Sequence, residues 1–139
     1  MGGVIAFEMA RQLREAGEPV ATLALIDSYT PDAVKAGERG GLRLASDPAG
    51  ETPLYRANVQ AMDRYAPRPY GGSVKLFAAA GLGEMNGLLH DLQLDGWKKL
   101  AGDALTTVSV PGDHYSILRQ PGAQQLSDAL ARYIDEATD

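Results

Sequence analysis

Two patterns of hydrophobic residues follow one another at the start of this chain. Residues 4–16 carry apolar side chains at helical spacing with charged residues between them, and Gly17 is a plausible stop. Residues 20–26 (Val-Ala-Thr-Leu-Ala-Leu-Ile) then form an almost continuous apolar run of strand length. Such a run is typical of a strand that is buried on both faces. The pattern therefore predicts a helix followed by a buried strand that ends at Asp27.

The same two patterns continue along the rest of the chain. Thr52 and Pro53 predict the start of a helix that runs to about Tyr65, with threonine as the N-cap and proline in the first turn. The polar, glycine-containing stretch 28–51 predicts a loop or mobile insertion. Further apolar runs predict strands at 74–80 and 105–110, a short helix at 95–100 and a closing amphipathic helix at 122–137.

Strands that are separated by helices, each apolar throughout, predict an α/β fold with a parallel sheet and helices on its faces. A length of 139 residues allows one domain at most. Three strands make a thin sheet for this architecture, and the chain opens with a helix that no strand precedes. Both observations indicate part of a larger domain.

Composition excludes several classes of function. The net charge is -5 and the 13 Lys and Arg residues are scattered, which argues against a nucleic-acid partner. The absence of cysteine excludes disulfides, thiolate metal sites and a cysteine nucleophile, and it fits a cytoplasmic protein. No apolar run approaches the roughly 20 residues that a membrane helix needs. Two histidines and scattered acids show no metal-ligand spacing, so no metal site is expected.

Asp27 and His114 are the residues that best fit catalytic chemistry. In open α/β sheets, functional groups gather beyond the carboxyl ends of the strands. Asp27 ends the first predicted strand and His114 lies four residues beyond the third. A carboxylate there can orient a histidine and leave its other ring nitrogen free to take a proton. The alternative that spacing leaves open is a turn-capping aspartate and a histidine on a surface turn.

A nucleophile for this pair is missing from the pattern. A nucleophile elbow has the form Gly-x-Ser-x-Gly, of which Met1 and Gly2 would be only the final two residues. Ser28 and Ser116 do not lie in such a motif, so we expect them to make cap or turn contacts. His90 is the only other histidine and is interpreted as structural or solvent-exposed.

Several segments resemble type I thioesterase domains, which end nonribosomal peptide synthetases and polyketide synthases. The first ten residues, Met-Gly-Gly-Val-Ile-Ala-Phe-Glu-Met-Ala, resemble the family's elbow and the helix that follows it. Residues 25–28 resemble the strand end that bears the triad aspartate, and residues 111–115 resemble the turn that bears the triad histidine. Residues 65–79 and the Gly96-Trp97 pair also fit, so the resemblance runs from end to end.

The resemblance implies the C-terminal portion of an α/β-hydrolase fold over residues 1–139, with about three parallel strands, flanking helices and a short lid-like insertion at about 28–51. It implies that Asp27 orients His114 as the general base. The nucleophile serine is expected immediately before Met1, and therefore absent from this chain. The backbone N–H of Met1 is expected to contribute to the oxyanion hole.

The implied activity is release of an acyl or peptidyl chain from the phosphopantetheine arm of a carrier protein, by hydrolysis or macrocyclisation. The carrier protein is the expected partner, no bound cofactor is expected, and without its serine the chain is expected to be inactive alone. The alternative is a non-catalytic α/β module that binds an acyl chain or a carrier protein. The strand at 20–26 is expected to expose an unpaired edge, which favours self-association.

Overall fold

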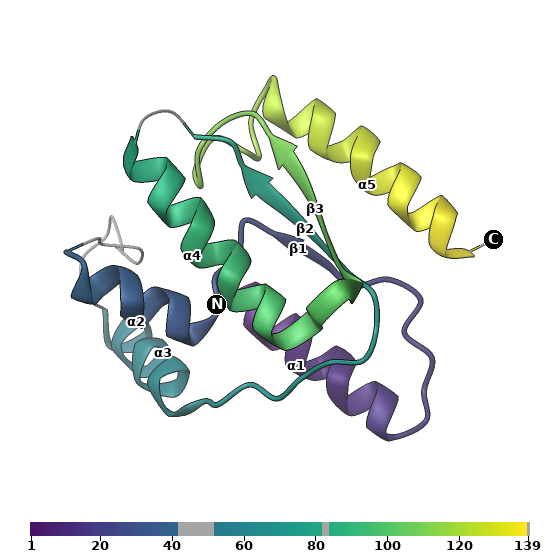
Figure 1. Ribbon diagram of the computed structural model, residues 1–139, viewed down its shortest axis with the longest axis horizontal. Coiled ribbons are helices and arrows are strands. Elements are labelled where there is room, and N and C mark those ends of the chain that lie inside the picture. The colour runs from purple at the N-terminus through teal and green to yellow at the C-terminus, as the bar shows by residue number, and fades with distance from the viewer. Residues whose placement is uncertain (42–51, 82–83, 139) are drawn as a thin grey trace.

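The computed structural model describes residues 1–41, 52–81 and 84–138 of the chain. These residues form five α-helices, one short 3-10 helix (η1) and three strands (Figure 1). In chain order they are α1 (Gly2–Glu15), β1 (Ala24–Ile26), α2 (Pro31–Arg39), α3 (Pro53–Arg64), β2 (Val74–Ala79), α4 (Glu84–Ala101), η1 (Gly102–Ala104), β3 (Leu105–Val110) and α5 (Gly122–Thr138).

The three strands form one parallel sheet in the order β1-β2-β3, which confirms the predicted fold class. Leu25 of β1 pairs with Leu76 of β2, and Phe77 of β2 pairs with Val108 of β3. All three strands therefore end at the same edge of the sheet. That edge is where the chain turns at Asp27 and where it continues towards His114.

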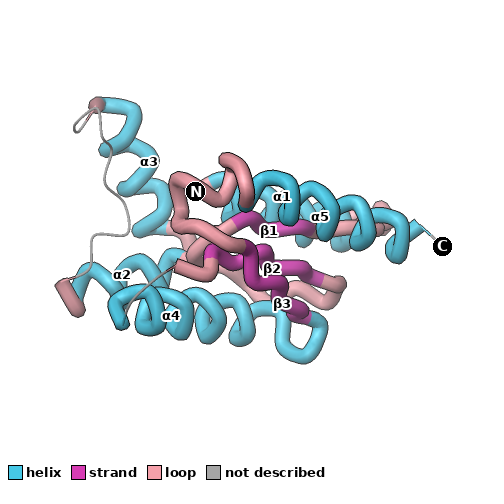
Figure 2. Tube along the Cα trace, turned by 90° about the horizontal axis from the view of Figure 1, so that it is seen from above, coloured by secondary structure: helices cyan, strands magenta, loops and turns pink. Residues whose placement is uncertain are grey.

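Helices cover both faces of the sheet. Figure 2 shows α1 and α5 on one side and α2 and α4 on the other. One core cluster joins residues of α1, β1, β2 and α4, and a second joins β2, β3 and α5. In the first cluster the rings of Phe7 and Trp97 lie 5.2 Å apart between centroids. Burial of these aromatic and aliphatic side chains is the main force that holds the layers together.

The expectation of a loop over 28–51 is wrong for Pro31–Arg39, which form α2. Thr30 is the N-cap of this helix, its side-chain oxygen accepts the N–H of Ala33 at 3.3 Å, and Pro31 occupies the first turn. This is the same threonine-proline signal that starts α3 at Thr52 and Pro53. The remaining part of the expected insertion, residues 42–51, lies outside the described residues.

Helix α4 is much longer than the short helix expected at 95–100. Its glycines lower the intrinsic helix propensity, but tertiary packing overrides that preference. The buried positions Gln93, Gly96, Trp97 and Ala101 follow helical spacing and face the protein interior. A Cβ at Gly96 would lie 2.3 Å from Thr30 Oγ1, so glycine allows α4 to approach the start of α2. None of the helices in the described ranges is long and apolar enough to cross a membrane.

The edge strands differ from the prediction in length or burial. Strand β1 has three residues instead of the seven expected at 20–26, and in the described part of the chain it pairs with β2 alone. Strand β3 is not buried on both faces, because Thr106, Thr107 and Ser109 are exposed. Of the three strands, only the central β2 fits the prediction of near-complete burial.

Candidate active site

Asp27 is held at the end of β1 by the end of β2. Its backbone has φ 39, in the left-handed region that aspartate tolerates better than most residues. Its N–H donates to the carbonyl of Phe77 at 2.8 Å, and its Oδ1 accepts the N–H of Ala79 at 3.0 Å. The side chain is buried, with 3% of the residue exposed. Main chain and carboxylate are therefore both fixed to the neighbouring strand.

His114 lies on a tight turn that follows β3. Gly112 has φ 114, a conformation that glycine adopts without strain. Oδ1 of Asp113 accepts the N–H groups of Tyr115 and Ser116, each at 2.9 Å. Oγ of Ser116 accepts the N–H of Asp113 at 2.8 Å, which confirms the expected turn contact of this serine. These reciprocal bonds fix the backbone on both sides of His114.

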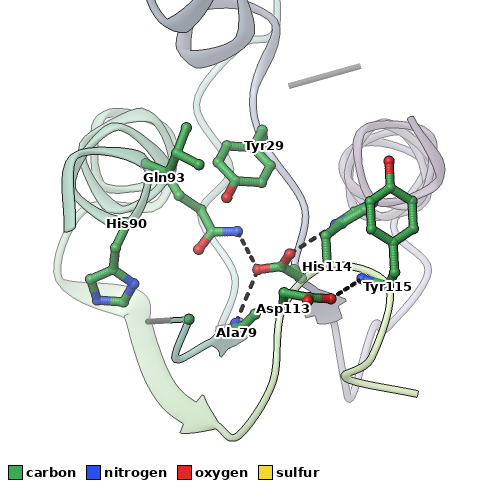
Figure 3. A pocket seen from close by; sticks show the side chains of 10 residues that line it. Tyr29, Ala79, His90, Gln93, Asp113, His114 and Tyr115 are labelled. Atoms are coloured by element: carbon green, nitrogen blue, oxygen red, sulfur yellow. Dashed lines mark hydrogen bonds and ion pairs between the residues drawn. The ribbon is translucent and has the colours of Figure 1, made fainter. Parts of the chain in front are cut away.

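The structure brings Asp27 and His114 together across 87 sequence positions. Nδ1 of His114 lies 2.8 Å from Oδ2 of Asp27, and Figure 3 marks this contact with a dashed line. An ionised carboxylate only accepts hydrogen bonds, so Nδ1 carries the proton and donates it. The imidazole is 57% exposed, whereas the Asp27 side chain is 4% exposed. The geometry leaves Nε2 of neutral His114 as a proton acceptor beside a buried acid.

Each member of the pair shifts the pKa of the other. Burial acts to raise the pKa of Asp27, but the hydrogen bonds from His114, Ala79 and Gln93 together outweigh it and hold this pKa below its usual value. The hydrogen bond to Asp27 raises the pKa of His114, against the opposing effect of burial. The contact thus favours a carboxylate and an imidazole that holds a proton more tightly than usual.

Two side chains of α4 complete the environment of the Asp27 turn. Nε2 of Gln93 donates to Oδ1 of Asp27 at 3.1 Å and to the carbonyl of Ser28 at 3.2 Å. Nε1 of Trp97 donates to the same Ser28 carbonyl at 2.7 Å. Gln93 was not among the residues expected at the site, because 81–94 was not predicted as helix. Gln93 lies one helical turn before Trp97, so a prediction that extended the helix back to Gln93 would have placed both side chains on the same face.

A pocket of about 270 Å³ opens beside the pair. His90 of α4, interpreted from the sequence as structural or solvent-exposed, is one of the residues that line this pocket (Figure 3). Burial and the charge of Asp27 raise the pKa of Tyr29 to about 12, which keeps this phenol neutral. No group of three metal-binding side chains occurs among the residues that the structure describes. The pocket is lined by Asp27, Tyr29, Ala79, Gly81, Leu89, His90, Gln93, Asp113, His114 and Tyr115.

The start of α1 reaches the same region. A Cβ at Gly3 would lie 2.2 Å from Oγ of Ser28, so the first turn of α1 packs directly on the residue after Asp27. Among the residues that the structure describes, the buried Oγ of Ser28 has no hydrogen-bond partner, so the cap or turn contact expected of this serine is not found there.

Comparison with known sequences identifies relatives over almost the whole chain. The thioesterase domain family model matches residues 1–137. Erythronolide synthase EryA3 of Saccharopolyspora erythraea is 30% identical over 148 residues, covering 96% of this chain and 4% of the synthase. The non-reducing polyketide synthase Crz7 of Cladonia metacorallifera is 28% identical over 184 residues, covering 98% and 9% respectively. The chain thus spans less than a tenth of either relative.

Solved structures agree with the sequence relatives. The thioesterase domain of NocB, from the nocardicin cluster, is 28% identical and superposes with a TM-score of 0.67. The match covers 96% of this chain and 61% of the NocB domain. A four-domain nonribosomal peptide synthetase, AB3403, shares the fold with a TM-score of 0.61 at 22% identity. On the family match and these relatives, the chain belongs to the thioesterase domain family of polyketide and nonribosomal peptide synthases.

Proposed function

We propose that this chain is the C-terminal part of a thioesterase that releases an acyl or peptidyl chain from a carrier protein. His114 is the general base and Asp27 is the acid that orients it. The observation that carries the proposal is the contact of 2.8 Å between His114 Nδ1 and Asp27 Oδ2, at the edge of the sheet and beside a pocket. A carboxylate in this position also stabilises the imidazolium that forms during acyl transfer.

The proposed reaction needs a serine, and no Gly-x-Ser-x-Gly occurs in the 139 residues. In the scheme implied by the resemblance, that serine occupies the position directly before Met1. Its hydroxyl oxygen attacks the thioester carbonyl while Nε2 of His114 takes its proton. The tetrahedral intermediate collapses, the pantetheine thiolate leaves and takes the proton from His114, and the acyl chain stays on the serine.

The second half of the reaction releases the chain. Nε2 of His114 takes a proton from water or from a nucleophile within the chain, which attacks the acyl-serine ester. Collapse returns that proton to the serine oxygen and yields a free acid or a macrocycle. The backbone N–H of Met1 is proposed as an oxyanion donor, and its place as the N-cap residue of α1 supports this because helix N-termini favour negative charge.

The carrier protein is the proposed partner, and its phosphopantetheine arm carries the substrate as a thioester. Support comes from relatives that are themselves polyketide synthases and from structural neighbours that include a four-domain nonribosomal peptide synthetase. In such synthases the product chain is built while it is attached to the protein. A further step must therefore cleave the finished product from the protein.

Thioester hydrolysis by two purified proteins tests the proposal. One is the 139-residue chain, and the other is the same chain extended by the residues encoded in frame upstream of Met1. An extended chain that carries Gly-x-Ser is expected to hydrolyse an acyl thioester. His114→Ala and Asp27→Asn are each expected to lower kcat by about 10³ to 10⁴-fold. The 139-residue chain is expected to show no turnover.

Two results would overturn this assignment. Turnover by the 139-residue chain that disappears in His114→Ala would show that no serine upstream of Met1 is needed. An extended chain without turnover that still binds a carrier protein, unaffected by Asp27→Asn and His114→Ala, would instead establish the non-catalytic binding module.

A further inference from the structure

Gln93 is a buried amide placed between two acceptors of the Asp27 turn. It comes from the middle of α4 and has 1% of its surface exposed. Its Nε2 lies 3.1 Å from Oδ1 of Asp27 and 3.2 Å from the carbonyl oxygen of Ser28. Both neighbours accept hydrogen bonds and neither can donate, so only the NH₂ end of the amide fits there. Each of its two protons then has its own acceptor.

The donors around the carboxylate divide unequally between its two oxygens. Oδ1 of Asp27 accepts from the backbone of Ala79 on β2 and from Gln93 on α4. Oδ2 accepts from His114. The torsion that rotates a carboxylate about its Cβ–Cγ bond is broad, so the donors around the group decide its plane. Gln93 is the third donor, from a different element than Ala79 and His114, and it restricts that rotation further.

We propose that Gln93 is a positioning residue for the acid: it holds the plane of the Asp27 carboxylate so that one oxygen faces Nδ1 of His114, and so keeps the proton of neutral His114 on Nδ1. This role gains its catalytic meaning from the proposed function, because a base that accepts the serine proton at Nε2 must be protonated at Nδ1. Gln93 acts through Asp27 and does not contact the reacting atoms.

Trp97 supplies an internal comparison. It lies on the same face of α4, four residues after Gln93, and donates to the same Ser28 carbonyl at 2.7 Å. Its indole has a single N–H, which the Ser28 carbonyl takes up, so Trp97 does not support the Asp27 carboxylate as the Gln93 amide does. Loss of the Trp97 side chain therefore removes one hydrogen bond to the Ser28 carbonyl. Loss of the Gln93 side chain removes a hydrogen bond to the same carbonyl and also one to the Asp27 carboxylate.

The test is NMR spectroscopy of the imidazole nitrogens in the 139-residue chain, labelled with ¹⁵N. Gln93→Met keeps the approximate length and volume of the side chain and removes both donors. It is expected to lower the ratio of the Nδ1–H to the Nε2–H form of neutral His114 by about fivefold, which is what the loss of roughly one net hydrogen bond produces. The pKa of His114 is expected to fall as its contact with Asp27 loosens. Trp97→Phe, as the matched control, is expected to leave both quantities unchanged.

A wild-type tautomer ratio in folded Gln93→Met would overturn the proposal, as would an equal change in Trp97→Phe. Should Gln93→Met not fold, Gln93→Asn replaces it, because the shorter amide no longer reaches the carboxylate and the same decrease is expected. The measurement needs neither a nucleophile nor a substrate. It therefore separates failure of the positioning role from failure of the proposed thioesterase activity.

Discussion

The contact between the first turn of α1 and the residue after Asp27 gives a quantitative prediction. Gly3 is the second residue of α1, and a Cβ built on it lies 2.2 Å from Oγ and 2.5 Å from Cβ of Ser28. Gly3→Ala must therefore push the helix and the turn apart. Gly2→Ala is the matched control, since a Cβ at this neighbouring position meets no atom within 4 Å.

The expected cost follows from two opposing effects. Overpacking in a well-packed region costs about 1–3 kcal/mol, whereas replacing glycine by alanine in a helix gains at most about 1 kcal/mol and less in the first turn. Gly3→Ala should therefore lower the free energy of unfolding by about 1–2 kcal/mol. Ser28→Gly removes both clashing atoms, and the nearest remaining atom is Cδ2 of Leu25 at an ordinary 3.5 Å. In that background Gly3→Ala should be neutral or slightly stabilising.

Urea denaturation followed by the fluorescence of Trp97, the one tryptophan of the chain, measures all four members of this double-mutant cycle. Trp97 is buried against Phe7 of α1, so its emission reports loss of the packing at issue. The expected coupling between Gly3→Ala and Ser28→Gly is about 1–3 kcal/mol. An equal cost of Gly3→Ala in both backgrounds would refute the close packing of α1 on the Asp27 turn.

Three further outcomes are expected. The pKa of Asp27 is lowered in the folded state, so the Asp27–His114 contact stabilises the fold above the unfolded pKa of Asp27, and this stability is lost as the pH falls through the folded pKa. The pKa of His114 is raised in the folded state, so the contact stabilises the fold below the unfolded pKa of His114, and this stability is lost as the pH rises through the folded pKa. The contribution should be largest between about pH 4 and pH 6.5, and pH-dependent unfolding of wild type and Asp27→Asn should differ most there; a constant difference from pH 3 to 9 would contradict it. Gly112→Ala adds strain at φ 114 and a Cβ 2.8 Å from a side-chain oxygen, and should destabilise by about 1–3 kcal/mol, whereas Gly102→Ala, at φ 57 with open space, should cost less in the same assay. The outer edge of β1, unpaired among the described strands, predicts a dimer or larger assembly in sedimentation velocity, and a folded monomer at all concentrations would disprove it.

The parts of the fold that the sequence predicted well are those with a strong local signal. Apolar runs located β2 and β3, and the threonine-proline pair located α3. The same pair at Thr30 and Pro31 starts α2, but the glycines that follow favoured a loop. The length of β1 could not be predicted, because it depends on how far the neighbouring strand pairs with it and not on its own apolar run.

At the site, the two strand ends were predictable and the support behind them was not. Asp27 and His114 follow apolar strands, and parallel strands bring their ends to one edge. Gln93 has no such signal, since a glutamine in a helix is most often exposed and only the packed tertiary structure shows what it faces. The location of His90 at the pocket depends in the same way on the length and orientation of α4.

The backbone conformation of Asp27 affects how substitutions at this position should be interpreted. With φ 39, the position favours aspartate and asparagine over β-branched or bulky residues before any chemistry is considered. A residue such as valine would combine loss of the carboxylate with backbone strain at the exit of β1, and its effect on activity could not be assigned to either cause. Asp27→Asn retains the preferred conformation, removes the charge and replaces one accepting oxygen by an NH₂ donor. Both residues suit the backbone conformation. Relatives that carry aspartate and never asparagine at this position would therefore indicate selection for the acid itself.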